Sequence, residues 1–312
     1  MASLRRCPAR SFCEIRLRVP PRASEAVANF LFELGAPGLV EGTPRGARGV
    51  TLRAPFGARR RAEAAACRLR RFLRALRALG TLRGRARVAV YAAQGAEWAE
   101  RWKRYARPIR IGRRLIVQPS WARAGRAGAV TVTLDPGMAF GTGGHATTRL
   151  CLEALARHLR GGERVLDVGT GSGILAIAAA TLGARDVFAA DTDPLACRIA
   201  RENARRNGVG KQVRVRHGSV TACAGRGFDL AVANLTASDL AAVLPELARR
   251  VRPGGLVVVS GLLRGQESAG RRAARAAGLG AVAARRRAGW VALEALVPDG
   301  EDGWSMPRRG AA

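Results

Sequence analysis

The sequence is poor in the features that mark membrane, secreted and metal-binding proteins. It has no run approaching the eighteen or so consecutive apolar residues of a membrane-spanning helix, and residues 1–21 carry arginines where a signal peptide has its apolar core. The cysteines show no Cys-x-x-Cys spacing and the three histidines are scattered, so neither a disulfide framework nor a metal site is expected. We therefore expect a soluble cytoplasmic protein without a membrane partner or a bound metal. Its cysteines are predicted to be reduced thiols and mostly packing residues: Cys7, Cys13, Cys67, Cys151, Cys197 and Cys223.

Acidic residues are few and lysine is almost absent. The chain has 23 acidic against 54 basic residues, a formal net charge of +31, and its only lysines are Lys103 and Lys211. Charge of this sign attracts polyanions such as ribosomal RNA. The arginines are, however, spread along the chain with little aromatic interleaving, as a codon bias would leave them. The charge alone leaves both explanations open.

The apolar content provides for two cores. With 312 residues, 48% of them hydrophobic, the chain is long enough for one small and one large domain. In residues 1–94 the hydrophobic patterns follow the order β-α-β-β-α-β, which is typical of ferredoxin-like α+β domains. This part holds no cluster of titratable side chains, so we expect it to recognise a substrate or to pack. The predicted strands are 12–19, 38–41, 49–53 and 86–91, and the predicted helices are 23–34 and 59–79.

Two segments flank the predicted large domain. Residues 95–107 are predicted to form a helical linker, in which Trp98, Trp102 and Tyr105 share one face. That face either docks on the larger domain or forms a hinge or a wall of a substrate cleft. Residues 299–312 are polar and contain glycine and proline, which predicts a loose tail.

Strand and helix patterns alternate through residues 108–298. Repeated strand-helix units with apolar strands predict a parallel sheet covered on both faces, so the expected fold is a Rossmann-like, doubly wound α/β domain that binds a cofactor. The predicted strands are 115–118, 130–134, 164–168, 186–190, 213–216, 228–233 and 255–260; the predicted helices are 147–158, 174–182, 194–207 and 238–251.

A glycine-rich turn follows the strand 164–168. Gly169, Gly171 and Gly173 permit a tight turn at which the backbone can approach a ligand. A dinucleotide fingerprint would place its third glycine at the position of Ile174, so the spacing favours S-adenosylmethionine over NAD. Asp167, just before the turn, is predicted to orient the turn or the amino group of the cofactor.

Two further polar residues follow apolar strands. Asp191 is placed to accept hydrogen bonds from ribose hydroxyls, whereas Asp193 is a candidate N-cap for the helix that starts at Pro194. Asn234 has donors and an acceptor, which suits it to hold a reacting amine. A loop-capping role for Asn234 is the alternative.

A second glycine-rich segment, residues 135–148, reads Asp-Pro-Gly-Met-Ala-Phe-Gly-Thr-Gly-Gly-His-Ala-Thr-Thr. Together with the turn, Gln118-Pro119-Ser120-Trp121, Asn234-Leu235 and the segment 260–266, it resembles the bacterial methyltransferases of ribosomal protein L11. The resemblance covers most of residues 95–270. It implies S-adenosylmethionine-dependent methylation of lysine ε-amines, and of the terminal α-amine, of this large-subunit protein. It also implies that the small domain recognises that protein, free or on the large subunit, and a monomeric enzyme is expected.

The same resemblance implies roles for individual residues. Thr148, Gly169, Asp191 and Asn234 match cofactor-binding positions, and the family usually has proline where this chain has Ala146. Phe140 and Gly141 are added to the predicted cofactor-binding residues.

Asn234 and His145 are the catalytic candidates, and His145 either accepts a proton or fixes the loop 140–148. Three other functions stay open: methylation of another protein or of RNA, noncatalytic binding to the ribosome, and dehydrogenation with NAD.

Overall fold

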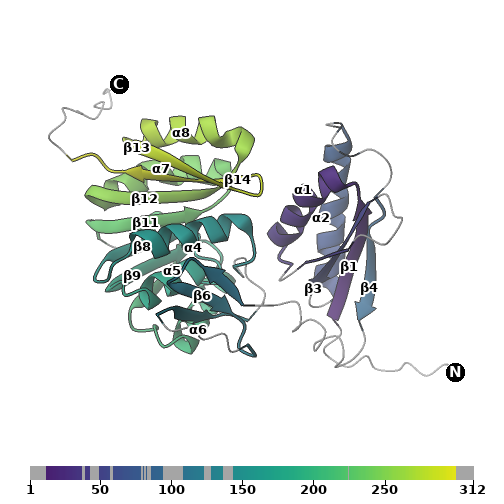
Figure 1. Ribbon diagram of the computed structural model, residues 1–312, viewed down its shortest axis with the longest axis horizontal. Helices are drawn as coiled ribbons and strands as arrows, with labels where there is room; N and C mark the ends of the chain where they lie inside the picture. The colour runs from purple at the N-terminus through teal and green to yellow at the C-terminus, as the bar shows by residue number, and fades with distance from the viewer. Residues whose placement is uncertain are drawn as a thin grey trace. The chain divides into compact units, whose positions relative to one another are not determined.

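The computed structural model describes residues 12–36, 39–42, 49–56, 59–78, 80, 82, 86–93, 108–122, 128–135, 143–223 and 225–299. The chain separates into two compact units, of which the first contains the strands β1 to β4 and the second the strands β5 to β14 (Figure 1). The predicted linker 95–107 lies outside the described residues. Within the described ranges, no helix is both long and apolar enough to cross a bilayer.

The N-terminal unit is a four-stranded antiparallel sheet with the strand order β2-β3-β1-β4. Its two helices lie on one face of the sheet (Figure 1). This order and the sequence of elements are those of a ferredoxin-like domain, so the predicted fold class of this part is confirmed. The elements are β1 Phe12–Val19, α1 Pro21–Glu33, β2 Val40–Gly42, β3 Val50–Phe56, α2 Arg59–Ala78 and β4 Ala89–Ala93.

The core of this unit follows from strand alternation and helical spacing. Ile15, Leu17 and Val19 alternate along β1 and are at most 3% exposed, as expected for a strand with one face against helices. The rings of Phe30 in α1 and Phe72 in α2 stack with centroids 4.1 Å apart. These contacts give the small unit a core of its own.

The C-terminal unit is built on a seven-stranded sheet with the strand order β10-β9-β8-β11-β12-β14-β13. The first five strands run parallel, while β14 pairs antiparallel with both β12 and β13. The elements are α4 Ala146–His158, β8 Arg164–Val168, α5 Ile174–Thr181, β9 Asp186–Asp191, α6 Pro194–Arg206, β10 Val213–His217, η1 Val220–Ala222, β11 Phe228–Asn234, α7 Ala237–Arg250, β12 Val251–Leu263, η2 Arg264–Gln266, α8 Glu267–Ala276, β13 Gly280–Arg287 and β14 Trp290–Leu296.

Helices cover both faces of this sheet. Residues of α4, α5 and α6 share one buried apolar cluster, and residues of α7 and α8 belong to a second. From β8 the chain adds β9 and β10 on one side and then returns to place β11 on the other side. The switch point between β8 and β11 is where such sheets bind ligands. The predicted Rossmann-like architecture is confirmed.

Three parts of this unit differ from the expectation. The strands predicted at 115–118 and 130–134 join a separate three-stranded sheet made of β5 Ile109–Ile111, β6 Leu115–Gln118 and β7 Val130–Thr133. The sequence pattern also missed α8 and the antiparallel pair β13 and β14. The sequence of β13, Gly-Ala-Val-Ala-Ala-Arg-Arg-Arg, lacks the alternation of apolar and polar residues that marks a strand. The nearly continuous apolar run of β14 does not by itself distinguish a strand from a helix.

Among the five described cysteines none forms a disulfide. Cys13, Cys151, Cys197 and Cys223 are buried, whereas Cys67 is exposed. The prediction that the cysteines are mostly packing residues is therefore confirmed among the five, with Cys67 as the exception.

Candidate functional site

The turn after β8 depends on glycine at three positions. Gly169, Gly171 and Gly173 have φ angles of +75°, +55° and +84°, in the left-handed region that side chains other than glycine disfavour. A Cβ on Gly169 would overlap the Leu235 side chain, and one on Gly173 would lie 3.1 Å from Ala200. The turn is thus closed to larger residues.

The backbone of this turn is tied to the neighbouring strand. The amides of Gly169 and Thr170 donate to the Ala190 carbonyl over 2.9 and 3.0 Å. Gly173 is the N-cap of α5 and supplies no side-chain cap. The N-cap residue of α5 therefore leaves its first turn without a side-chain cap of its own, and the turn lies at the switch point where such folds bind nucleotides.

Asp167 is a buried carboxyl group at the base of the turn. It is fully buried; its Oδ2 accepts hydrogen bonds from the Thr170 hydroxyl at 2.6 Å and the Ala176 amide at 3.1 Å. Its Oδ1 has no hydrogen-bond partner, and no ion pair reaches the carboxyl group, among the described residues. Burial raises the pKa of Asp167 to about 7, and the hydrogen bonds from Thr170 and Ala176 offset only part of that effect. A cationic group next to Oδ1 would stabilise the ionised form.

Asp191 lies at the end of β9 and connects the turn to the next loop. Its Oδ2 accepts the Gly171 amide at 2.8 Å and its Oδ1 accepts the Asp193 amide at 2.9 Å. Each carboxylate oxygen has a second lone pair, so Asp191 keeps the capacity to accept hydroxyl groups. Asp193 accepts the Leu195 amide and is the N-cap of α6.

Asn234 and Thr148 come together from two elements that are distant in the sequence. Asn234 ends β11, and its Nδ2 donates to the Thr148 Oγ1 in α4 over 3.3 Å. Thr148 is 1% exposed and Asn234 is half-buried. Thr148 is the acceptor of this hydrogen bond, and the side-chain carbonyl oxygen of Asn234 is a further acceptor. The predicted residues on α4, β8, β9 and β11 therefore meet around one switch point.

His145 is the N-cap of α4. Its Nδ1 accepts the Thr147 amide at 3.3 Å and lies 2.6 Å from the Thr147 hydroxyl. The ring packs edge-to-face on Trp290 with centroids 5.0 Å apart, and burial lowers the pKa of His145 to about 4. A neutral, packed imidazole that begins a helix favours the role of fixing this segment.

Two residues near the turn had no predicted role. Leu235 lies over Gly169, and its backbone carbonyl would overlap a Cβ on Gly261, whose φ is +101°. Trp290 of β14 contacts His145. The glycine at 261 beside an apolar strand is a sequence signal for such a close backbone approach, but nothing in the sequence indicates that Trp290 reaches α4.

The remaining predictions concern two cofactor-binding residues, metal binding and the other two histidines. Phe140 and Gly141 fall outside the described residues, and the described residues contain no group of three or more His, Cys, Asp or Glu side chains arranged for a metal ion. His158 pairs with Glu294, and His217 lies 3.1 Å from the Thr192 carbonyl. At the end of β10, His217 pairs in register with Asp191.

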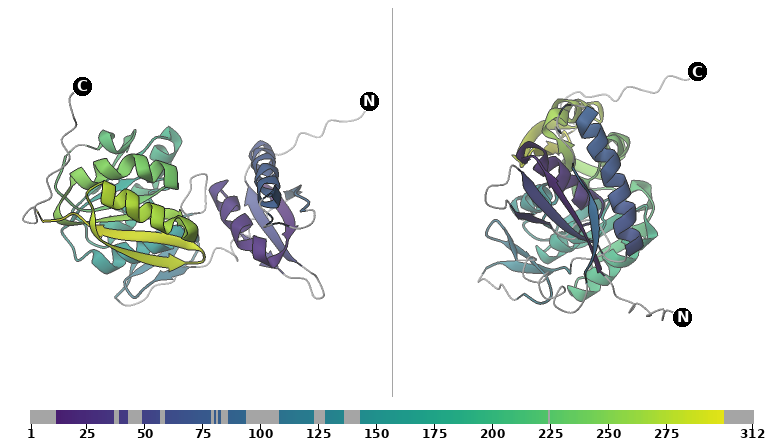
Figure 2. Two further views of the ribbon diagram at one scale, coloured as in Figure 1. Left: turned by 90° about the horizontal axis from the view of Figure 1, so that it is seen from above. Right: turned by 90° about the vertical axis from the view of Figure 1, so that its right-hand side faces the viewer.

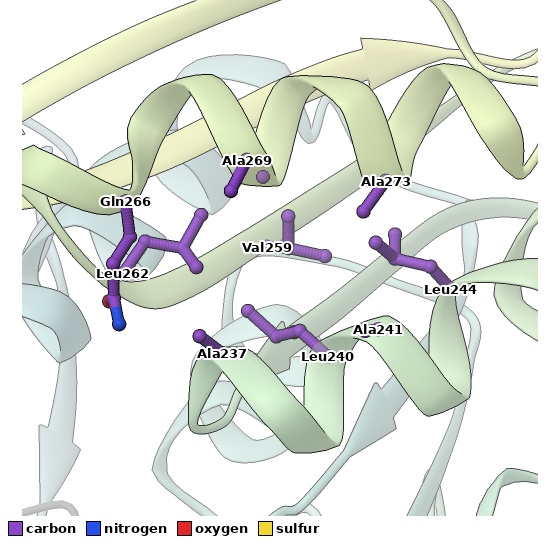
Figure 3. A pocket seen from close by; sticks show the side chains of 10 residues that line it. Ala237, Leu240, Ala241, Leu244, Val259, Leu262, Gln266, Ala269 and Ala273 are labelled. Carbon is purple, nitrogen blue, oxygen red and sulfur yellow. The ribbon is translucent and has the colours of Figure 1, made fainter.

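An apolar groove of about 180 Å³ lies between α7 and α8. Val259 and Leu262 of β12 form its base, and its lining holds no titratable side chain (Figure 3). It is distinct from the switch point and lacks groups for catalysis. Its walls come from Ala237, Leu240, Ala241, Leu244, Gln266, Ala269, Gly270 and Ala273.

Comparison with known proteins gives one family. A model of the family described as ribosomal protein L11 methyltransferase (PrmA) matches residues 11–297. A protein of that name from Pelotomaculum thermopropionicum is 48% identical over 201 residues, which are 64% of this chain and 65% of the relative. One from Symbiobacterium thermophilum is 48% identical over 203 residues, 65% of this chain and 66% of the relative. The chain thus spans just under two thirds of the length of these relatives.

A solved structure shows the same similarity. The ribosomal protein L11 methylase from Lactobacillus delbrueckii subsp. bulgaricus superposes with a TM-score of 0.57 at 33% identity. The match covers 62% of this chain and 100% of that chain.

Proposed function

Because the chain belongs to the ribosomal protein L11 methyltransferase family, we propose that it methylates amines of ribosomal protein L11 with S-adenosylmethionine as the methyl donor. The observation that carries this proposal is the meeting of Asp167, Asp191 and Asn234 at the switch point, around a turn that only glycine can form. The family match supports ribosomal protein L11 as the substrate, and the residues of the site support methyl transfer as the reaction.

The proposed cofactor site uses backbone and acidic groups. The amides at Gly169 to Gly173 border the space, Asp191 accepts the ribose hydroxyls, and Asp167 balances positive charge. Thr148, Phe140 and Gly141 complete the proposed set. When bound, S-adenosylmethionine supplies a methyl group on a positively charged sulfur, which makes that methyl group electrophilic.

The residues around Asn234 have to keep the acceptor as a free amine. A lysine with an ordinary pKa of about 10.4 costs about 4.6 kcal/mol to deprotonate at pH 7. Desolvation and neighbouring positive charge both lower an amine pKa. The Asn234 carbonyl oxygen can then accept an amine N–H and direct the lone pair, so positioning supplies the catalysis without a dedicated base.

The other parts of the proposal concern recognition. We assign recognition of L11, free or on the large subunit, to the N-terminal unit, and the acceptors are lysine ε-amines and the terminal α-amine. A monomer in the cytoplasm fits this role. The N-terminal unit folds around its own core, which provides a separate surface for recognition.

Mass measurement of the product tests the proposal. The purified chain is incubated with S-adenosylmethionine and unmethylated L11, and we expect mass increments of one or more methyl groups. Asp191→Ala should abolish both the heat of cofactor binding and the increments. Cofactor binding without any increment would reject L11 as the substrate, and transfer of labelled methyl groups to RNA would favour an RNA methyltransferase. If the chain binds no cofactor, the result favours a noncatalytic binding protein. If it binds NAD and not S-adenosylmethionine, the result favours a dehydrogenase.

A further inference from the structure

The outer side of α2 carries a concentrated set of arginines. The buried residues of this helix recur at helical spacing between Ala62 and Leu76 and point to the sheet. The opposite side of the helix is exposed. α2 is the long blue helix in the right-hand view of Figure 2. We call the following residues the α2 arginine face, and all of them are exposed: Arg60, Arg68, Arg70, Arg71 and Arg74.

Acidic residues do not neutralise this face. Glu63 is the only acidic residue of α2 and it pairs with Arg59 at 2.7 Å. Within the described part of the chain no ion pair involves a residue of the α2 arginine face; Arg70 donates only to the Val88 carbonyl at 3.3 Å. A codon bias that replaces lysine by arginine leaves the net charge of the helix unchanged. It therefore does not explain why the α2 arginine face has so few acidic residues beside it.

Some arginines elsewhere share an acid. On β1 and β3, Arg16 and Arg53 share Glu14. In the C-terminal unit, Arg271 and Arg286 share Glu267. Exposed arginines without an ion pair among the described residues also occur elsewhere, such as Arg205, Arg272 and Arg275, but α2 places five of them on one side of a single helix.

The chemistry of the face fits the phosphates of a duplex. Arginine donates paired hydrogen bonds to phosphate, and Arg60 to Arg74 extend over about 21 Å of helix. Besides Glu63, small residues are exposed beside these arginines, namely Ala64, Cys67 and Ala75. The only aromatic ring of α2, Phe72, stacks on Phe30 inside the unit. Single-stranded nucleic acid is bound by stacking on exposed aromatic rings, whereas duplex RNA is recognised by shape and backbone contacts.

As a ligand of the α2 arginine face, an acidic protein fits the proposed function less well than RNA does. A protein that assembles on RNA carries basic surfaces of its own, so the α2 arginine face would repel such a substrate. The nucleic acid next to a ribosomal protein is RNA. We propose that the α2 arginine face binds the phosphate backbone of double-stranded RNA. The choice of RNA over DNA rests on the proposed function, while the choice of a duplex phosphate backbone rests on the face itself.

The test compares two triple variants of the full chain with equal net charge. The face variant reverses the charge of three residues of the α2 arginine face by the substitutions Arg60→Glu, Arg71→Glu and Arg74→Glu. The control variant reverses the charge of three exposed arginines of α6 and α8 that have no ion pair among the described residues. Its substitutions are Arg205→Glu, Arg272→Glu and Arg275→Glu. The probe is a fluorescent RNA duplex of about 20 base pairs, followed by anisotropy over a range of salt concentrations. We expect the face variant to lose at least about tenfold in affinity and about three units of salt slope. The control variant should lose less than about threefold.

Several results would overturn the inference. Equal losses in both variants would show that only net charge matters. If a DNA duplex of the same length or single-stranded RNA binds as tightly as the RNA duplex or more tightly, double-stranded RNA is refuted as the ligand. If polyglutamate at equal charge displaces the RNA, the result favours an acidic protein. Methylation of free L11 is measured on the same samples. If the wild type methylates L11 but does not bind RNA, only this inference fails; if it binds RNA but does not methylate L11, only the proposed function fails. Unchanged thermal unfolding of both variants confirms that they fold.

Discussion

Both units bury carboxyl groups, and Glu14 of the N-terminal unit differs from Asp167 of the C-terminal unit in what surrounds it. Glu14 of the N-terminal unit is 6% exposed and lies between two guanidinium groups, with Arg53 at 2.9 Å and Arg16 in direct contact. Burial would raise the pKa of Glu14, but the hydrogen bonds from Arg53 and Arg16 outweigh it and the pKa falls below its usual value. Asp167 of the C-terminal unit is fully buried, has no such cation among the described residues, and its pKa is raised to about 7.

The proposed function interprets this difference as that between a structural carboxyl group and one that accepts a ligand. In a chain with 54 basic residues, arginine is available near almost any acid. A buried carboxyl group without an arginine partner is consequently costly for the free protein. At Asp167 this cost fits a site whose positive charge arrives with the cofactor.

The largest effect is expected from closing the turn beside Asp167. Gly169→Ala places a Cβ into Leu235 and forces a φ of +75° on alanine, so kcat/KM should fall at least about a hundredfold, some 2.7 kcal/mol of transition-state stabilisation. Gly208→Ala is the matched control, because Gly208 has a φ of +73° and open space around it. Gly208→Ala should cost roughly 1–2 kcal/mol of stability and leave S-adenosylmethionine binding unchanged. Equal activity losses in the two variants would mean that backbone strain, and not the shape of the turn, matters.

The stability of the free protein should depend on pH through Asp167. Its folded pKa of about 7 lies above the unfolded value. Between pH 4 and pH 7 the folded protein therefore holds a proton that the unfolded chain has released, and stability falls as the pH rises, by about 4 kcal/mol in total. Asp167→Asn removes this dependence, so denaturant titrations should show the variant gaining on the wild type from pH 5 to pH 8. Parallel pH curves for the two proteins would refute the raised pKa.

Glu14→Gln should act only on the N-terminal unit. Its carboxylate contributes stability above its ordinary pKa, and this stability is lost as the pH falls through the lowered folded pKa. Because Arg16 and Arg53 are each about two-fifths exposed, they regain water in the variant and the loss at pH 7 should be about 1 kcal/mol. Thermal unfolding measures it. A weaker affinity of Glu14→Gln for S-adenosylmethionine would contradict the division between the two carboxyl groups.

The smallest effect is expected at His145. Asparagine keeps an N-cap acceptor, so His145→Asn should reduce kcat by less than about fivefold, well below the roughly hundredfold or greater effect of losing a general base. The pH profile of kcat should keep its shape. A profile that loses an ionisation in His145→Asn would restore the base role.

The sequence predicted which residues meet at the switch point, because local rules govern their placement, while their roles toward a cofactor stay a prediction. Strand ends, a glycine turn and acids after apolar strands are visible in the pattern, and Asp167, Gly169, Asp191 and Asn234 meet as expected. The predicted resemblance is confirmed by the family match over residues 11–297.

Long-range contacts set what the sequence did not predict. The contact of Trp290 with His145 joins β14 to α4, and the position of Leu235 over Gly169 depends on how β11 and β12 pair. The pattern also gave no sign that Asp167 lacks an arginine partner while Glu14 has two. Spacing along a chain does not report which charges lie next to each other after folding.

Calorimetric titration of the free protein with S-adenosylmethionine at pH 6 tests the central claim most directly. Two buffers with different ionisation enthalpies reveal proton exchange, because a group with a pKa of about 7 is about nine-tenths protonated at that pH. The account predicts that binding releases close to one proton in the wild type and none in Asp167→Asn. Binding with the same heat in both buffers, or no binding at all, would contradict it.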